Sequence, residues 1–217
     1  MKAIKKANKE FWEVPYLPID PKDVGRSYEA IIRINSQSGK GGIAYVLQAD
    51  YGLNLPRSLQ VEFSQDIQQI TDAEGKEVPA KRIHDRFLER YVDQPGARLK
   101  FVDHQTFPDT AKTGRRAVEA TIVDNGREMT ISGTGTGPID GFVDALSRHV
   151  GVELSVLDYS EHSMQRGSNA SAICYLEMEH PGGKLFGAGI SSNIVAASLE
   201  AVVSAANRIL DEQAKRA

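Results

Sequence analysis

The sequence predicts an α+β protein in which a small region of helices and one hairpin precedes two pseudo-symmetric βββα units. Three observations support this class. Apolar residues alternate with polar ones over several short runs, as in half-buried strands. Two later runs carry apolar residues at helical spacing, and the order of three strands and one helix occurs twice. We expect residues 1–93 to form linker subdomains and residues 97–217 to form the duplicated domain, with units at 97–151 and 152–217.

The first unit is predicted from three alternating runs and one helical run. Asn125 and Gly126 supply a tight hairpin turn between the second and third strands. Gly151 marks the end of the helix, since glycine readily adopts the left-handed conformation that ends many helices. The apolar positions of the strands and the helix are Leu99, Phe101, Val118, Ala120, Ile122, Met129, Ile131, Ile139, Phe142, Val143 and Leu146.

The second unit follows at once with the same order of elements. Strands are expected around residues 152–156, 172–178 and 185–190, and the turn before the third strand contains Gly182 and Gly183. A helix closes the unit, with Val195, Leu199 and Val202 on its apolar side. Units of about fifty residues are too small to be stable alone, so the two should share a core. Sheet faces that stay uncovered would favour a homodimer.

The first 93 residues lack this repeat. Three prolines within residues 12–23 remove backbone donors and predict an extended strap. The β-rich runs 28–34 and 42–49, joined by a glycine-bearing loop, predict a hairpin. Pro56 opens a predicted helix, and a second helix is expected over residues 79–92. Turn residues at 93–96 indicate the domain boundary.

Composition excludes several classes of function. The chain has 217 residues, 26 Lys and Arg against 29 Asp and Glu, and a net charge of -3. Without a concentrated basic face, nucleic-acid binding is not expected. The longest apolar candidate, residues 193–210, is interrupted by polar residues, and no apolar run follows the basic start, so we expect neither a membrane span nor a secretory signal and predict a cytoplasmic protein. The single Cys174 lies among apolar residues and is interpreted as a buried hydrophobe.

The segment SGTGTGP, residues 132–138, leads from a predicted strand into a predicted helix. Such a turn exposes backbone N–H groups at the positive end of the helix, where a carboxylate or phosphate can bind. The alternative is a tight turn whose glycines serve the fold alone. A dinucleotide site fits poorly because the spacing is G-x-G-x-G and the setting is antiparallel. The second unit has GAGISSN, residues 187–193, at the corresponding place.

Other candidate motifs are weaker. Residues 38–41 resemble a phosphate loop but fail the Walker pattern. No two of the five histidines have metal-ligand spacing, and no Ser-His-Asp order, paired carboxylates or activated cysteine stands out. The run LDYSEHS, residues 157–163, gathers polar and titratable groups just after a strand. It is either an ordinary solvated loop or part of a ligand lid.

Four runs of the sequence resemble the C-terminal part of α-isopropylmalate synthases, which catalyse the first committed step of leucine biosynthesis: WEVPYLPIDPKDVGRSYEAIIRINSQSGKGGIAYVLQADYGLNLPRSLQVEFSQ from Trp12, SGTGTGP, LDYSEH and ASLEAVVSAANR. The resemblance implies linker subdomains followed by a regulatory domain of two βββα units that binds leucine at a dimer interface. In the family, a TIM barrel binds a divalent metal and condenses acetyl-CoA with 2-oxoisovalerate. These 217 residues hold no such barrel, so we expect no cofactor or metal and no catalysis from this chain alone.

The resemblance also implies the effector-binding residues and one residue that transmits inhibition. The backbone at Gly135 and Gly137 should lie beside the leucine, and Tyr159 should help to close the pocket. Relatives often carry Ala at the positions of Asp140 and Ser163, and Asn at that of Thr136, so Asp140 could repel the ligand carboxylate or pair with the ligand ammonium. The full expected set is Gly135, Gly137, Asp140, Tyr159, Ser163 and Ala170 for the effector, with Tyr28 for transmission.

Three alternatives remain open from the sequence. The chain could be an oligomerisation module whose glycine turns only shape the fold. It could be the isoleucine-sensing domain of a related citramalate-type synthase. It could also be an enzyme that holds a mononucleotide at SGTGTGP, although no general base is placed by the sequence.

Overall fold

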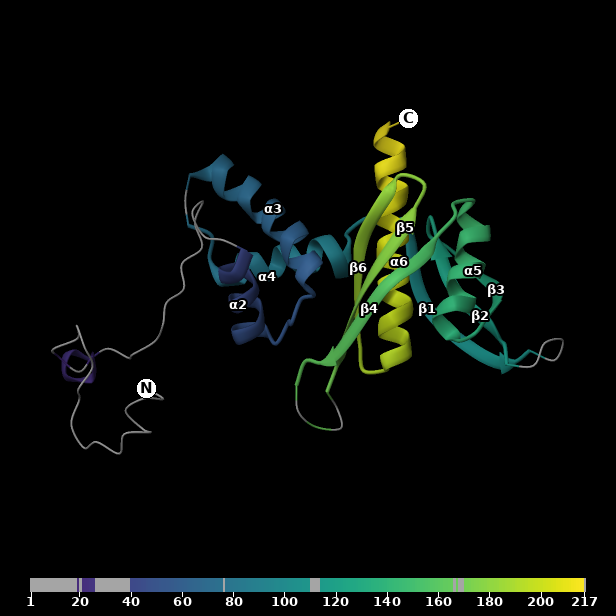
Figure 1. Cartoon of the computed structure of the whole chain (residues 1–217), viewed down its shortest axis with the longest axis horizontal. Coiled ribbons are helices and arrows are strands. Elements are labelled where there is room, and N and C mark those ends of the chain that lie inside the picture. The colour runs from purple at the N-terminus through teal and green to yellow at the C-terminus, as the bar shows by residue number, and fades with distance from the viewer. Residues whose placement is uncertain are drawn as a thin grey trace. The chain divides into compact units, whose positions relative to one another are not determined.

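The computed structural model describes residues 19, 21–25, 40–75, 77–109, 114–165, 167 and 170–216 (Figure 1). The chain divides into two compact units, Met1–Ile32 and Arg33–Ala217. The described element of the first unit is the short 3-10 helix η1, Pro21–Val24. The predicted strand over residues 28–34, with Tyr28, and most of the predicted strap lie outside the described residues.

The second unit begins with a layer of helices, which we term the helical layer. It consists of α2 (Lys40–Tyr51), α3 (Arg57–Glu74), α4 (Ala80–Leu88) and the π-helical turn η2 (Glu89–Asp93). The two helices predicted from Pro56 onward and over residues 79–92 are confirmed. Ile83, Phe87 and Tyr91 are fully buried, as their spacing of four predicted.

The prediction of a strand over residues 42–49 is wrong, because these residues lie in α2. Ile43, Val46 and Leu47 are buried together on one side of the helix. Positions i, i+3 and i+4 lie on one side of a helix, so all three side chains can face α3 and α4. The loop glycines next to this run suggested a hairpin, yet tertiary packing of one apolar side decides the helix.

The order of three strands and one helix, found twice, is confirmed. The expectation that residues 157–163 form a loop or lid after a strand is wrong, because the strand runs from Ser155 to Ser163 and includes them. The first repeat contains β1 (Leu99–Pro108), β2 (Arg116–Asp124), β3 (Arg127–Gly135) and α5 (Pro138–Val150). The second contains β4 (Ser155–Ser163), β5 (Ala172–His180), β6 (Gly183–Ser191) and α6 (Ile194–Arg216). Each repeat forms an antiparallel three-stranded sheet in sequence order. No described helix is long and apolar enough to cross a membrane.

The predicted turns take the expected conformations. Asn125 and Gly126 have φ values of 49° and 81°, the left-handed pair that a two-residue hairpin requires. Gly151, at φ 69°, ends α5, and its N–H donates to Ser147 O. Each first strand also contains a bulge, at Val102 in β1 and at Leu157 in β4. Both bulged side chains are about half exposed.

Two cores stabilise the second unit. In the first core, α5 packs on β2 and β3, while α6 packs on β5, β6 and β1 (Figure 1). The second core joins the helical layer to the other side of the β4–β6 sheet through Ile173, Tyr175, Phe186 and Ala188. The β4–β6 sheet is therefore covered on both sides, which explains why nearly every residue of β5 is buried.

Candidate functional site

The β3–α5 corner is built on glycines that allow strand and helix to touch. A Cβ at Gly133 or Gly135 would collide with the backbone of α5 at Gly141. Gly137 differs, because its φ of -159° suits any residue and a Cβ there would meet nothing within 4 Å. The first two glycines of SGTGTGP thus serve packing, whereas Gly137 faces open space.

The β6–α6 corner repeats this geometry. A Cβ at Gly187 would collide with the backbone of Ala201 and Ala205, and one at Gly189 would collide with Ala197. Gly189 is the counterpart of Gly133, because a Cβ at either position would collide with the backbone of the helix residue eight positions later. Close packing against a helix backbone thus accounts for four of the five glycines at the two corners, which are Gly133, Gly135, Gly187 and Gly189.

The two helices differ at their first turns. Among the described residues, no side chain caps the start of α5, whose first residue is Pro138. The start of α6 is capped, since Asn193 Oδ1 accepts hydrogen bonds from the N–H groups of Val195 at 2.9 Å and Ala196 at 3.2 Å. Backbone donors at the positive end of a helix attract anions unless a side chain occupies them. The α5 corner is therefore the open one.

Asp140 lies at this open corner but does not cap the helix. Its Oδ2 accepts hydrogen bonds from Thr136 N at 2.7 Å and from Thr136 Oγ1 at 3.1 Å. The carboxylate is exposed. It thus adds a negative charge on the strand side of the corner, while the helix amides of Ile139 and Asp140 have no side-chain partner in the described part of the chain.

The other expected effector residues lie on β4 and after it. Tyr159 is 53% exposed, and Ser163 Oγ donates to Gln165 O. Ala170 N donates to Gly167 O at 3.3 Å. Within the described residues, no hydrogen bond or ion pair joins this group to the α5 corner. The structure thus places the expected residues in two groups, and Tyr28 lies outside the described residues.

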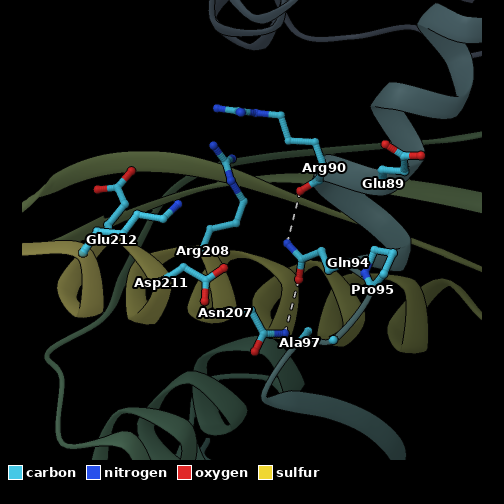
Figure 2. A pocket seen from close by; sticks show the side chains of 11 residues that line it. Glu89, Arg90, Gln94, Pro95, Ala97, Asn207, Arg208, Asp211 and Glu212 are labelled. Carbon is cyan, nitrogen blue, oxygen red and sulfur yellow. Dashed lines mark hydrogen bonds between the residues drawn. The ribbon is translucent and has the colours of Figure 1, made fainter.

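A cavity of about 280 Å³ lies elsewhere, between α6 and the turn that follows η2 (Figure 2). Gln94 spans it, since its Nε2 donates to Arg90 O at 3.2 Å and its Oε1 accepts from Asn207 Nδ2 at 3.2 Å. None of the expected effector residues lines this cavity. Its charged lining balances three acids with three bases and so favours neither ligand charge: Glu89, Asp211 and Glu212 against Arg90, Arg208 and Lys215.

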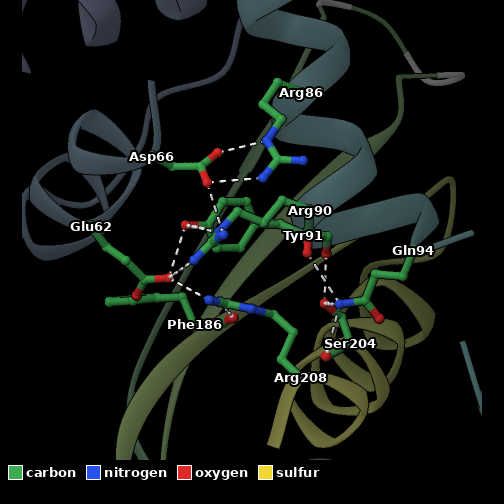
Figure 3. A network of polar contacts seen from close by, with 9 residues as sticks. All are labelled: Glu62, Asp66, Arg86, Arg90, Tyr91, Gln94, Phe186, Ser204 and Arg208. Carbon is green, nitrogen blue, oxygen red and sulfur yellow. Dashed lines mark hydrogen bonds and ion pairs between the residues drawn. The ribbon is translucent and has the colours of Figure 1, made fainter. Parts of the chain in front are cut away.

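Charged side chains join α3 to α4 and η2 within the helical layer (Figure 3). Asp66, 8% exposed, binds Arg86 through both oxygens at 2.7 and 2.9 Å, and it binds Arg90 at 2.9 Å. Burial alone would raise the pKa of Asp66, but the hydrogen bond from Arg86 and the charges of both arginines outweigh it and lower the pKa. Asp66 is therefore ionised at neutral pH and fixes α4 against α3.

A second set of polar contacts joins the helical layer to the last helix and strand (Figure 3). Glu62 Oε1 accepts from Tyr91 Oη at 2.9 Å and from Arg208 Nη2 at 2.7 Å. Arg208 also donates to Phe186 O and lies over the Tyr91 ring, 4.7 Å from its centre. Sequence reasoning missed this junction. Its one signal was a pair of equal spacings, Glu62 to Asp66 and Arg86 to Arg90.

Cys174 is fully buried, which confirms its interpretation as a small hydrophobe. Burial raises the pKa of its thiol to about 11, although a hydrogen bond with Ser198 opposes the shift. The thiolate that a nucleophile requires is thus scarce at neutral pH. Among the described residues, no three His, Cys, Asp or Glu side chains come together in a way that could hold a metal ion.

Two βββα repeats that share one core define a duplicated α+β domain. The chain belongs to the LeuA allosteric (dimerisation) domain family, whose model matches residues 77–210. A model described as alpha-isopropylmalate synthase, post-catalytic domain-like, matches residues 1–48.

Curated relatives agree with this family. The chain is 84% identical over 215 residues to a 2-isopropylmalate synthase of Mesorhizobium japonicum and 74% identical over 215 residues to one of Agrobacterium fabrum. In both comparisons the match covers 99% of this chain and 38% of the relative. Identity to the 2-isopropylmalate synthase of Mycobacterium leprae is 51% over 201 residues, which is 92% of this chain and 32% of that protein. The chain thus spans well under half the length of these relatives, and the resemblance to this family is confirmed.

Proposed function

We propose that this chain is the leucine-sensing and dimerising region of a 2-isopropylmalate synthase. The observation that carries the proposal is the uncapped start of α5, where free backbone donors lie beside the Asp140 carboxylate. An amino acid is a zwitterion, so its carboxylate fits the helix amides and its ammonium fits Asp140. The reaction under control would be the condensation of acetyl-CoA with 2-oxoisovalerate, performed in the cytoplasm by a catalytic barrel outside these residues.

Two terms set the expected affinity. The helix dipole contributes about 0.3–1 kcal/mol to holding the carboxylate. Burying the isobutyl side chain contributes about 1.5–3 kcal/mol. Apolar burial therefore dominates, and discrimination against valine is limited to the roughly 1–3 kcal/mol that one methylene supplies. Isoleucine has the same number of carbons as leucine, so shape alone separates the two ligands.

A second copy of the chain would complete the pocket. Tyr159 and Leu157 on β4, an edge strand, are about half exposed. Tyr159 pairs with Leu176, so it faces the side of the sheet on which α6 covers β5 and β6. Large apolar side chains at a sheet edge favour contact with another chain. We propose that, in a homodimer, the surface around Tyr159 on β4 of one copy lies against the open α5 corner of the other copy.

Calorimetric titration of the folded dimer with leucine, isoleucine and valine tests the proposal. Saturable heat with leucine binding tightest supports leucine sensing. Tightest binding of isoleucine would instead identify a citramalate-type sensor. Absence of binding heat at millimolar concentrations of all three would favour the alternative of a ligand-free oligomerisation module. That alternative is also supported by the close packing that explains four of the glycines.

A further inference from the structure

Strand β4 presents different residues to two different cores. Tyr159 and Glu161 pair with Leu176 and Cys174, which belong to the core shared by the repeats. His162 pairs with Ile173, which belongs to the core beneath the helical layer. Successive side chains of a strand point to opposite faces. The side chains of His162 and of Ser163, an expected effector residue, therefore lie on opposite faces of the strand.

His162 contacts the turn between α2 and α3. Its Nε2 lies 3.0 Å from Gly52 O and 3.3 Å from Asn54 N. One ring nitrogen serves one of these at a time, since a protonated Nε2 donates to Gly52 O and a bare Nε2 accepts from Asn54 N–H. Either bond ties the far end of β4 to residues 52–54, which are more than a hundred positions away in the sequence.

The surroundings hold this contact firmly. The His162 ring is stacked with the ring of Tyr175 at 5.6 Å between centres, and Tyr175 in turn meets Phe87 of α4 at 6.3 Å. Gly52 has a φ of 71°, and a Cβ there would lie 2.8 Å from Met164 O. The turn therefore packs closely against the backbone at Met164, just after β4, and only glycine fits at position 52.

We propose that His162 is the positioning residue that transmits effector occupancy from β4 to the helical layer. The inference rests on the proposed function, because it requires leucine to act on the opposite face of β4 at Tyr159 and Ser163. Binding that shifts β4 changes the contact between His162 and the Gly52–Asn54 backbone, since the two faces belong to one strand. The loop between α2 and α3 then reports the ligand.

Hydrogen exchange of the loop amides, above all Asn54 N–H, with and without leucine tests this inference, and calorimetry on the same samples reports leucine binding separately. In the wild-type dimer, leucine should change the exchange rate of the loop by at least about fivefold, the lower end of allosteric coupling. In His162→Ala, the affinity for leucine should change by less than about fivefold, while the change in the exchange rate of the loop on adding leucine (the loop response) disappears. His162→Gln, whose amide can donate or accept, should restore part of the response.

Ser160→Ala is the matched control, because Ser160 shares the face of His162 on β4 and makes no hydrogen bond with the loop within the described residues. A loop response that survives in His162→Ala overturns the inference, as does its loss in Ser160→Ala. A wild-type dimer that binds leucine without any loop response also overturns it, and leaves the leucine proposal intact. Absence of leucine heat in the wild type overturns both.

Discussion

The side-chain amide of Asn207 pairs with both backbone groups of Leu99. Its Nδ2 donates to Leu99 O at 2.9 Å, and its Oδ1 accepts from Leu99 N at 2.8 Å. Asn207 is 5% exposed and Leu99 is 1% exposed. A residue of α6 thereby takes the place of a neighbouring strand at the start of β1. The second repeat thus holds the first repeat in place through a buried polar contact.

Replacement Asn207→Ala should destabilise the domain by about 2–3 kcal/mol, because it leaves two buried backbone groups without partners. Urea unfolding at pH 7 measures the loss. Asp211→Ala, one turn later on the exposed side of α6, serves as the control and should change stability by less than about 0.5 kcal/mol. Equal losses in the two variants would contradict the role given to Asn207.

Replacement Gly187→Ala should cost about 1–3 kcal/mol or prevent folding, since the new methyl group collides with the α6 backbone. Gly41→Ala in α2 is the matched control, because no atom of the described residues lies within 4 Å of a Cβ there. It should be neutral or stabilise the helix by up to about 1 kcal/mol. Thermal melting separates the two, and an unchanged melt of Gly187→Ala would refute the close-packing account.

Asp124 should make stability depend on acid pH. The guanidinium of Arg98, helped by His149, holds the pKa of Asp124 at about 2 against burial, below its ordinary 3.8. A lowered pKa in the folded state stabilises the fold above pH 3.8, and this contribution fades as the pH falls toward 2. Asp124→Asn should therefore cost about 1–2 kcal/mol at pH 6, and the difference from wild type should narrow by about 1 kcal/mol at pH 3. A constant difference in urea unfolding at both pH values would show that the ion pair contributes nothing.

The fold was largely predictable because its signals are local. Alternating strands, the Asn125 and Gly126 turn and the helical spacing of α6 all depend on neighbours in the sequence. The strand expected over residues 42–49 failed because Ile43, Val46 and Leu47 gain their helical arrangement from α3 and α4, which no local pattern shows. The long-range junctions of Asn207, His162 and Glu62 depend on tertiary packing, so sequence reasoning could not find them.

The candidate site was predictable only in part. The sequence indicated a helix start at SGTGTGP, but it could not show that Asn193 caps the matching helix and leaves one corner open. Nor could it show that packing accounts for Gly133 and Gly135. The bond between Asp140 and Thr136 required the folded corner, because it decides on which side the charge lies.

Asp140→Ala should weaken leucine binding by about fivefold, close to 1 kcal/mol for an exposed ion pair. The reason is that Asp140 accepts both bonds from Thr136 through Oδ2, so that, among the described residues, Oδ1 has no partner that competes with the ligand ammonium. Calorimetry measures the change. Tighter binding in the variant would mean that the carboxylate repels the ligand instead.

A crystal structure of the dimer grown with saturating leucine tests the central proposal most directly. The account predicts that the leucine carboxylate lies at about 3 Å from the N–H groups at the start of α5, beside Gly137, with Tyr159 over the isobutyl group. Leucine bound elsewhere, or an α5 corner that holds only solvent, would contradict it.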